Sequence, residues 1–211
     1  MFISIEPHQH EKYRNLLSQM YQHRGEIFFH QREWDVDIDE HGYEIDEYDK
    51  LNPLYLMSIN SFGAVLSSMR VMPTVGPTLL SDVFYELIPT QTVVRSPLIW
   101  EVTRMTLNPF IEQKYRRGVA MAMWEILIGA NELALNSGIK QYIAVFDSPM
   151  ERYYKLCGWQ PEIIGRKSVR TNEDIMLGLW DVSNEISAKM LKRSQLSRGA
   201  IISRTLDKVA A

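Results

Sequence analysis

The sequence predicts an α/β fold, a three-layer α-β-α sandwich with a mixed central sheet, formed by a single domain of 211 residues. The chain length, with 45% hydrophobic residues, supplies one substantial core. Segments with strand patterns alternate with segments of helical period, in the order β, α, β-hairpin, β, α, β, α, β. Strands that alternate with helices imply a mixed sheet with helices on its faces.

The first half of the chain is organised around an acidic loop. Between Glu33 and Lys50 there are nine acidic residues and one basic residue, with almost no periodicity, which is typical of a mobile loop. Apolar residues before this loop recur every three or four positions, as on one helical face. The expected elements are a strand at 2–5, a helix from about 8 to 28, the loop at 31–50, a hairpin of 54–59 and 64–72, and a short helix at 81–87 begun by Ser81 or Asp82.

In the second half, strands and helices follow each other closely. A glycine at 138 is a plausible C-terminal cap, and Ser148-Pro149-Met150-Glu151 has the pattern of a capping box. The expected elements are strands at 98–104, 141–146, 163–164 and 175–180, helices from about 118 to 136 and from 148 to 157, and a basic, helical tail at 183–211.

Composition excludes several classes of protein. The net charge of −3 implies no nucleic-acid partner. Cys157 is the single cysteine and is expected to be a packing residue, so an intramolecular disulfide and a cysteine metal cluster are excluded, and no metal site is predicted. The most apolar long stretch, 119–135, carries Glu125 and Glu132, which argues against a membrane span. Without a secretory leader pattern, we expect a cytoplasmic protein.

Two charged residues interrupt the buried strand at 98–104. Glu101 and Arg104 are costly to bury unless they are paired or act in a cleft. The alternative is a strand that reaches the sheet edge, with both charges in water. Arg24 poses the same question, because it shares the apolar helical face that ends at Phe28. Taken alone, Arg24 is better explained as an arginine that snorkels at the helix edge.

The block Trp100-Glu101-Val102-Thr103-Arg104 resembles the W-E-x-S-R strand of the acyl-homoserine lactone synthases, the LuxI-type autoinducer synthases. The resemblance extends from about Arg24 to Trp159, in the family's order and spacing. Its other elements are Arg24, Phe28 and Trp34, then Asp46-x-x-Asp49, Arg70 before Pro73-Thr74, and Pro77-x-Leu79-Leu80-x-x-x-Phe84. The family shares the architecture of the GNAT acyltransferases. The resemblance therefore implies that the Glu101 strand and the Gln141 strand splay apart at one end, and that a thioester arm enters the V-shaped gap.

The resemblance also implies the reaction. The amino group of S-adenosylmethionine would attack an acyl thioester, and its carboxylate would then displace methylthioadenosine and close a lactone that serves as a quorum-sensing signal. Both compounds would be substrates, with no tightly bound cofactor. Glu101 and Arg104 would be the catalytic residues, with Glu101 as general base, either directly or through a water. Glu101 has an alternative structural role, which is to hold arginines by charge-assisted hydrogen bonds.

The implied residues on the S-adenosylmethionine side fall into three groups. Arginine suits the substrate carboxylate, and aromatic faces suit the adenine and the sulfonium. Other charged residues would complete an ion-pair network, since that many charges can be buried only if they are mutually paired. The set consists of Arg24 and Arg104 for the carboxylate, Phe28 and Trp34 as aromatic contacts, Asp46, Asp49 and Arg70 in the network, and Thr103 in place of the family's serine.

On the acyl side, backbone N–H groups just past Arg104 would hold the oxyanion if the strand bulges there. The acyl pocket would lie between the sheet and the helix at 118–136, although its candidate residues are equally good core residues. Ala144 stands near the position where some family members carry a threonine, which favours an acyl chain without a 3-oxo group. The set is Met105, Thr106 and Leu107 for the oxyanion, and Met123, Leu127, Ile143, Ala144 and Val145 for the pocket.

The acyl donor is expected to be either an acyl carrier protein or acyl-coenzyme A. Basic residues could meet an acidic carrier protein or the phosphates of coenzyme A. These residues are Arg116 and Arg117 in the turn before the helix at 118–136, Arg152 and Lys155 on the next helix, and the tail at 183–211. The turn also weakly resembles the pyrophosphate loop of the GNAT enzymes.

Two other functions fit parts of the pattern. A GNAT-type N-acyltransferase that uses acyl-coenzyme A and another amine would need the Arg116 turn, but not the acidic loop with Trp34. A non-catalytic relative would bind a thioester or an adenosyl ligand without turnover, and the presence of Glu101 argues against it. Thermal stabilisation of the protein by S-adenosylmethionine would distinguish a synthase from the GNAT-type N-acyltransferase. Turnover would distinguish a synthase from the non-catalytic relative.

Overall fold

The computed structural model describes residues 1–170 and 173–201. A seven-stranded sheet has the strand order β1-β2-β3-β4-β7-β9-β8, and only the β4–β7 pair is parallel. The predicted mixed sheet is therefore confirmed. The strands are β1 Phe2–Ile5, β2 Leu54–Ile59, β3 Val65–Pro73, β4 Ile99–Leu107, β7 Gln141–Asp147, β8 Glu162–Arg170 and β9 Glu173–Asp181, with a small hairpin of β5 Tyr115–Arg116 and β6 Val119–Ala120.

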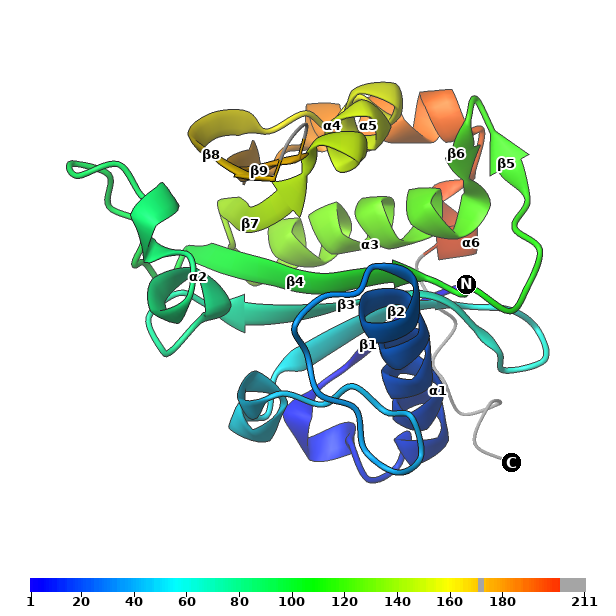
Figure 1. Ribbon diagram of the computed structural model, residues 1–211. Helices are drawn as coiled ribbons and strands as arrows, with labels where there is room; N and C mark the ends of the chain where they lie inside the picture. Colours follow the sequence, from blue (N-terminus) through cyan, green and yellow to red (C-terminus); the bar gives the residue numbers. More distant parts are fainter. Residues whose placement is uncertain (171–172, 202–211) are drawn as a thin grey trace.

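Helices cover both faces of the sheet, which confirms the three layers. α3, α4 and α5 lie on one face, and α1 lies on the other (Figure 1). The α-helices are α1 Arg14–Arg24, α2 Leu79–Asp82, α3 Met121–Ser137, α4 Ser148–Cys157, α5 Asn184–Ser194 and α6 Arg198–Ile201. Four other helical segments are the 3-10 helices η1 Pro7–Gln9, η3 Glu47–Leu51 and η4 Tyr85–Leu87, and the π-helix η2 Gly25–Gln31, which continues α1.

Each face of the sheet has its own apolar core because strand side chains alternate between the faces. The larger core lies under α3 and contains Trp124, Trp159 and Trp180. A second core lies between α1 and the first strands. A third, smaller core beneath α2 and η4 contains Leu80 and Ile143. The third core places α2 against β4 and β7, which determines the surroundings of Glu101.

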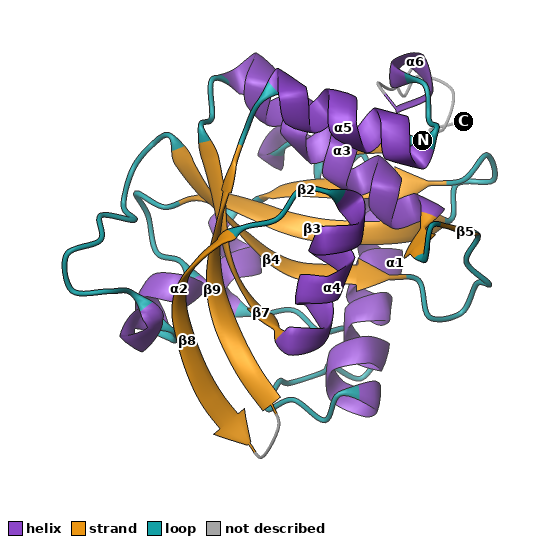
Figure 2. Ribbon diagram, turned by 90° about the horizontal axis from the view of Figure 1, so that it is seen from above, coloured by secondary structure: helices purple, strands orange, loops and turns teal. Residues whose placement is uncertain are grey.

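The two central strands form the expected V. β4 pairs with β7 only from Ile99, opposite Gln141, to Glu101, opposite Ile143. Beyond these pairs β4 stays with β3 while β7 stays with β9. Figure 2 shows β4 and β7 diverging from the end at which they pair.

Several element boundaries differ from the sequence prediction. α2 begins at Leu79 with Thr78 as its N-cap, not at Ser81 or Asp82. The predicted helix from about 118 begins at Met121, because the preceding residues form the β5–β6 hairpin. The Ser148 capping box is also wrong, because the Ser148 hydroxyl donates to the carbonyl of Asp174 at 3.2 Å.

Other local predictions are confirmed. Gly138 follows α3 with a φ of +75°, the left-handed conformation that favours glycine at a C-terminal cap. Cys157 is buried, and burial raises the pKa of its thiol to about 12. Ser183 caps α5, so the basic tail begins as a helix, while residues 202–211 of the predicted tail lie outside the described residues. No helix of the described chain has the length and apolar character needed to cross a membrane.

Candidate active site

Glu101 is buried where the pairing of β4 with β7 ends, and the residue is 2% exposed. Its carboxylate accepts hydrogen bonds from the backbone N–H groups of Leu80, at 2.6 Å, and Leu79, at 3.1 Å. The N–H groups of the first two residues of α2 are therefore both bound to the Glu101 carboxylate. Burial raises the pKa of Glu101 to about 7, although both hydrogen bonds and Arg70 act to lower it. A carboxyl group with this pKa can take up and release a proton near neutral pH.

The acidic loop lies against the start of η2 and directs three carboxylates inward. A Cβ on Gly25 would lie 2.1 Å from the carbonyl oxygen of Gly42, so this close approach requires a glycine. Glu44 then donates its backbone N–H to the carbonyl of Tyr21 at 3.1 Å. Asp46 caps η3 by accepting from the backbone N–H groups of Tyr48, at 2.9 Å, and Asp49, at 3.2 Å.

Arg24 is fully buried among two of these carboxylates. Its NH1 and NH2 groups donate to the two oxygens of Asp49, at 3.0 and 2.8 Å, and its Nε donates to Glu44. Burial lowers the pKa of Arg24, but the two carboxylates raise it by more. The pKa of Asp49 is well below its usual range because Arg24 and Arg70 outweigh the effect of its own burial. The snorkelling interpretation of Arg24 is therefore wrong.

Two more arginines complete a cluster of three guanidinium and three carboxylate groups. Arg70 donates to both oxygens of Asp46 and, through Nε, to the hydroxyl of Thr103 at 2.9 Å. The Nε of Arg104 donates to Glu44 at 3.0 Å, and its NH2 lies 3.1 Å from an oxygen of Asp46. The side chain of Arg104 is 10% exposed, whereas those of Arg24 and Arg70 are 0% and 1% exposed. Of the three arginines, Arg104 is the one that a ligand can reach.

The backbone of β4 bulges at Arg104. Thr103 is paired with Arg70 and Thr106 with Ser68, so β4 has one more residue than β3 between these pairs. Arg104 has a φ of +53°, a strained conformation for a residue with a side chain. The bulge turns Arg104 toward the charged cluster while Met105 faces the other side of the sheet. The predicted bulge is present, and it leaves Arg104 and Met105 without register partners on β3.

Two aromatic rings lie beside Arg104. The guanidinium carbon of Arg104 is 5.5 Å from the centre of the Phe28 ring. The Phe28 ring stacks on Trp34 with 4.9 Å between ring centres and 9° between planes. Phe28 is buried, whereas Trp34 is 45% exposed and covers Phe28 from the loop. An aromatic surface and a reachable guanidinium therefore lie next to each other.

The face of the sheet that α3 covers contains an apolar cavity of about 30 Å³, opposite the face on which the charged cluster lies. Among the predicted acyl-side residues, Met105, Leu127 and Ala144 line it. The other lining residues are Met69, Val102, Ala130, Tyr142, Tyr154, Trp159 and Trp180. Met123 and Leu107 belong to the same apolar core but do not line the cavity.

Three predicted acyl-side residues point to the other face of the sheet. Ile143 and Val145 pack in the core beneath α2, because they alternate along β7 with Tyr142 and Ala144. The expectation that these two side chains line the cavity is therefore corrected. Thr106 is buried, and its hydroxyl shares a hydrogen bond of 2.9 Å with Ser68.

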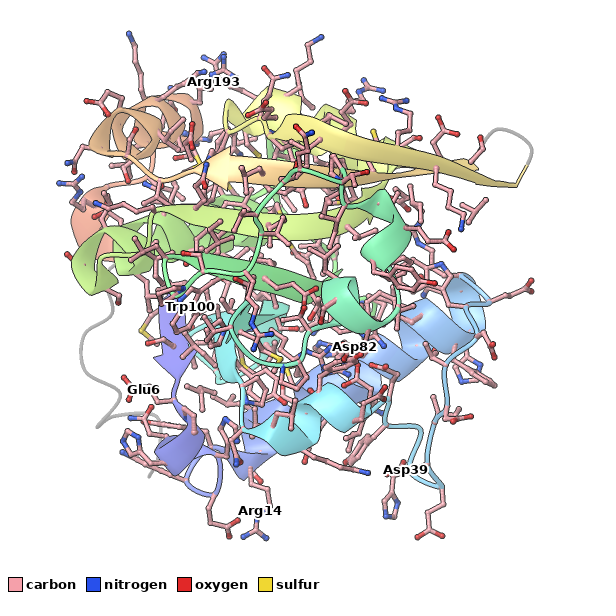
Figure 3. The ribbon with its side chains drawn as sticks, turned by 90° about the vertical axis from the view of Figure 1, so that its left-hand side faces the viewer. Glu6, Arg14, Asp39, Asp82, Trp100 and Arg193 are labelled. Atoms are coloured by element: carbon pink, nitrogen blue, oxygen red, sulfur yellow. The ribbon has the colours of Figure 1, made fainter. Side chains whose placement is uncertain are left out.

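The predicted basic contacts lie on the side of the molecule formed by α4, α5 and the β5–β6 hairpin. Arg117, Arg152 and Lys155 are exposed, and Arg116 is half-buried and donates to Gln195. Arg193 of α5, labelled in Figure 3, donates to the carbonyls of Lys155 and Leu156 at the end of α4. In the turn before α3, the N–H of Met121 donates to the carbonyl of Lys114, so this N–H is not available to an anion.

Sequence reasoning missed Glu44 and misassigned the structural role of Glu101. Glu44 links Arg24 to Arg104 and is 1% exposed, but it is one of nine acidic residues in an irregular segment. Gly25, a glycine within a helical pattern, was the one available signal that a loop approaches this helix closely. Among the described residues, Glu101 is hydrogen-bonded to α2 rather than to any arginine. No group of three His, Cys, Asp or Glu residues in the described chain is arranged to hold a metal ion.

Comparison with known proteins assigns this arrangement to a family. Residues 8–190 match the family model described as autoinducer synthase. The acyl-homoserine-lactone synthase of Rhizobium etli is 33% identical over 187 residues, which cover 88% of this chain and 85% of that protein.

Two solved structures support the fold. A CoA-dependent acyl-homoserine lactone synthase with SAM and isopentyl-CoA has a TM-score of 0.81 at 23% identity and covers 93% of this chain and 90% of its own. A putative N-acetyltransferase from Lactobacillus plantarum has a TM-score of 0.55 at 14% identity, over 87% of this chain and 98% of its own, which supports the GNAT-like class of the fold. From the extent of the family match and the identity with the Rhizobium etli enzyme, the chain belongs to the autoinducer synthase family, the acyl-homoserine-lactone synthases.

Proposed function

We propose that this chain acylates the amino group of S-adenosylmethionine with an acyl thioester, and then lets the substrate carboxylate displace methylthioadenosine to close the lactone. The observation that carries the proposal is the position of Glu101 beside the bulge at Arg104, where β4 leaves β7. The point at which β4 and β7 begin to diverge therefore holds two groups. One is a buried carboxyl group with a pKa of about 7, and the other is an arginine that a ligand can reach.

Glu101 is the proposed general base. As the amine attacks the thioester carbonyl, its proton passes to Glu101, directly or through a water. The C–S bond of the thioester then breaks, and the carrier leaves as a thiolate that takes up this proton. Both carboxylate oxygens already accept one hydrogen bond from α2, and each retains capacity for another. The protonated form is accessible because burial brings the pKa close to neutral pH.

Arg104 is the proposed contact for the substrate carboxylate. Its planar guanidinium can bind a carboxylate through two hydrogen bonds. Arg24 and Arg70 are better assigned to the charged cluster, because their side chains are 0% and 1% exposed and their donors are directed at its carboxylates, and in the case of Arg70 also at the hydroxyl of Thr103. The aromatic stack of Phe28 and Trp34 would meet the adenosyl and sulfonium groups.

The acyl chain would enter the apolar cavity lined by Met105, Leu127 and Ala144. The N–H of Met105, freed from register by the bulge, is the proposed oxyanion donor. Because the cavity encloses about 30 Å³, side chains must move or the V must open to admit a chain of several carbons. The Ala144 side chain leaves the cavity apolar at that point, which favours an acyl chain without a 3-oxo group.

The carrier would meet the basic residues of α4, α5 and the β5–β6 hairpin. Arg117, Arg152 and Lys155 are exposed and can contact an acidic carrier protein or the phosphates of coenzyme A. Replacing Arg152 and Lys155 together by Glu tests this contact. We expect a larger rise in KM for the donor that the protein uses than for the free acyl-pantetheine thioester, which lacks both carrier and nucleotide. The proposed compartment is the cytoplasm, and nucleic acids are not proposed as partners.

Mass spectrometry tests the whole proposal. The purified protein is incubated with S-adenosylmethionine and a panel of acyl thioesters on carrier protein and on coenzyme A. The synthase proposal requires methylthioadenosine and an N-acyl lactone to appear together, and both to be lost in Glu101→Gln. An acylated product of another amine, without methylthioadenosine, would contradict it. Thermal stabilisation by S-adenosylmethionine without product would instead support a non-catalytic relative.

A further inference from the structure

An ion pair connects the two arms of the V at its open end. Arg32 follows the last residue of η2, and its NH1 group donates to an oxygen of Asp147, the last residue of β7. Arg32 belongs to the arm that contains α1, β3 and β4. Asp147 belongs to the arm that contains β7, β9 and α4. Among the described residues, it is the one ion pair between the segment 14–52 and β7 or α4.

The Arg32–Asp147 pair lies in a part of the V where β4 and β7 are no longer paired as strands. The last register pair between β4 and β7 is Glu101 with Ile143. Asp147 lies four residues further along β7, about 13 Å beyond Ile143 at the usual rise of a strand. Ile143, Val145 and Asp147 share one face of the strand, and that face is the one on which Glu101 lies. Beyond Glu101, no pairing between β4 and β7 holds the two arms together.

Arg32 is the side chain that pairs with the carboxylate of Asp147. Asp147 is the N-cap residue of α4, yet its side chain makes no capping hydrogen bond. One carboxylate oxygen binds Arg32, and the other, Oδ1, is buried without a partner. The Asp147 side chain is 22% exposed and the Arg32 side chain 42% exposed. Loss of Arg32 would leave a partly buried charge without compensation.

Backbone hydrogen bonds connect the segment of Arg32 to the stacked rings of Phe28 and Trp34. Its backbone N–H donates to the carbonyl of Ile27 at 2.9 Å, and Trp34, two residues later, donates its backbone N–H to the carbonyl of Phe28 at 2.9 Å. The stack of Trp34 on Phe28 lies next to Arg104. A shift of Arg32 relative to Asp147 therefore moves the aromatic surface relative to β7.

We propose that Arg32 and Asp147 are positioning residues that fix the opening of the V, and thereby the placement of the bound amine relative to the thioester. This inference rests on the proposed function, in which S-adenosylmethionine is held on the arm that contains β4 and the acyl thioester lies between the two arms, against Met105 of β4 and Ala144 of β7. Each residue acts through the geometry of the arms and not by contact with the reacting atoms. A displacement of about 1 Å between reacting groups can lower a rate by about a hundredfold.

Charge exchange tests the pair. The variants are Arg32→Asp, Asp147→Arg and the double exchange, with the neutral variants Arg32→Gln and Asp147→Asn in case a reversal prevents folding. Arg14→Asp is the control, since Arg14 forms an exposed ion pair with Glu11, and Figure 3 places it at the edge of the molecule away from Asp82. The readouts are kcat and KM for the thioester, the Kd for S-adenosylmethionine, and hydrogen exchange of 25–34 and 147–157.

We expect each single variant to lower kcat/KM for the thioester by at least tenfold while the Kd for S-adenosylmethionine changes less than threefold. Hydrogen exchange should rise in both segments. The double exchange should restore both readouts at least in part, and Arg14→Asp should behave as the wild type. Single variants that match the control in both readouts, or a double exchange no better than either single, would overturn the inference. A wild type without lactone formation would refute the proposed function instead, and hydrogen exchange would still report whether the pair holds the arms together.

Discussion

The backbone N–H of Leu80 donates a hydrogen bond of 2.6 Å to the carboxylate of Glu101, so the general base proposed for this enzyme is held by the first turn of α2. Burial raises the pKa of Glu101 to about 7. A general base must be deprotonated to accept a proton, so kcat/KM should fall as the pH falls through about 7. Glu101→Gln should lower turnover at least a hundredfold. The variant should fold with a lower melting temperature, because the amide NH2 group cannot accept one of the two hydrogen bonds that Leu79 and Leu80 donate. A pH–rate profile and a melting curve measure both effects, and near-normal turnover would remove Glu101 as the base.

Asp82 offers a way to identify the titrating group. The negative charge of Asp82 helps to raise the pKa of Glu101, after the larger effect of burial. Tyr48 donates a hydrogen bond of 3.1 Å to Asp82, and an asparagine can still accept it. Asp82→Asn should therefore move the acid limb of the kcat/KM profile to lower pH without loss of the fold. A limb that stays in place, or moves to higher pH, would show that a group other than Glu101 controls it.

Much of this site follows from short patterns in the sequence, and the remainder depends on contacts between distant segments. A run of apolar residues after Ser96-Pro97 correctly places Glu101 and Arg104 on a strand, and Gly138 correctly marks the end of α3. The burial of Arg24 could not be predicted, because it depends on Glu44, a residue in a loop without periodicity. The prediction that Ile143 and Val145 line the acyl pocket with Ala144 is wrong, because adjacent residues of a strand point to opposite faces. The capping box predicted at Ser148 is wrong because the Ser148 hydroxyl donates to the carbonyl of Asp174 in the neighbouring strand.

The arginines of the charged cluster should separate into structural and binding roles. Arg24→Ala leaves Glu44 and Asp49 buried without their main partner, so the free energy of unfolding should fall by about 3–5 kcal/mol. Arg104→Ala should cost less stability, because its side chain is 10% exposed, but it should raise the Kd for S-adenosylmethionine at least tenfold. Urea unfolding and equilibrium titration measure the two quantities. An unchanged Kd in Arg104→Ala would refute its proposed contact with the substrate carboxylate.

His23 should make the protein sensitive to acid. It is buried on α1 with Nδ1 unpaired, beside Phe110, and burial lowers its pKa to about 4. The unfolded chain binds a proton to this histidine below about pH 6.5, whereas the folded protein does so only near pH 4, so stability should be lost as the pH falls through that window. The loss from this residue is on the order of 3 kcal/mol. Urea unfolding at pH 7 and pH 4.5 should show a smaller acid loss in His23→Phe, while the exposed His30→Phe should match the wild type. An equal acid loss in His23→Phe would contradict the assignment.

The pleat of β7 predicts which side chains control the acyl chain. Ala144 lines the cavity next to Met105, whereas Val145 packs beneath α2 on the opposite face. Ala144→Leu adds three carbons to a cavity of about 30 Å³, so it should shift the preferred thioester to a shorter chain and lower kcat/KM for the longest chain used by at least tenfold. Val145→Leu adds one carbon to the same strand but faces away from the cavity, so it should keep the wild-type order of chain preference. Competition between thioesters of different length, read out as the ratio of lactone products, measures the preference. The same shift in both variants would mean that the acyl chain does not occupy this cavity, since Val145 faces away from it.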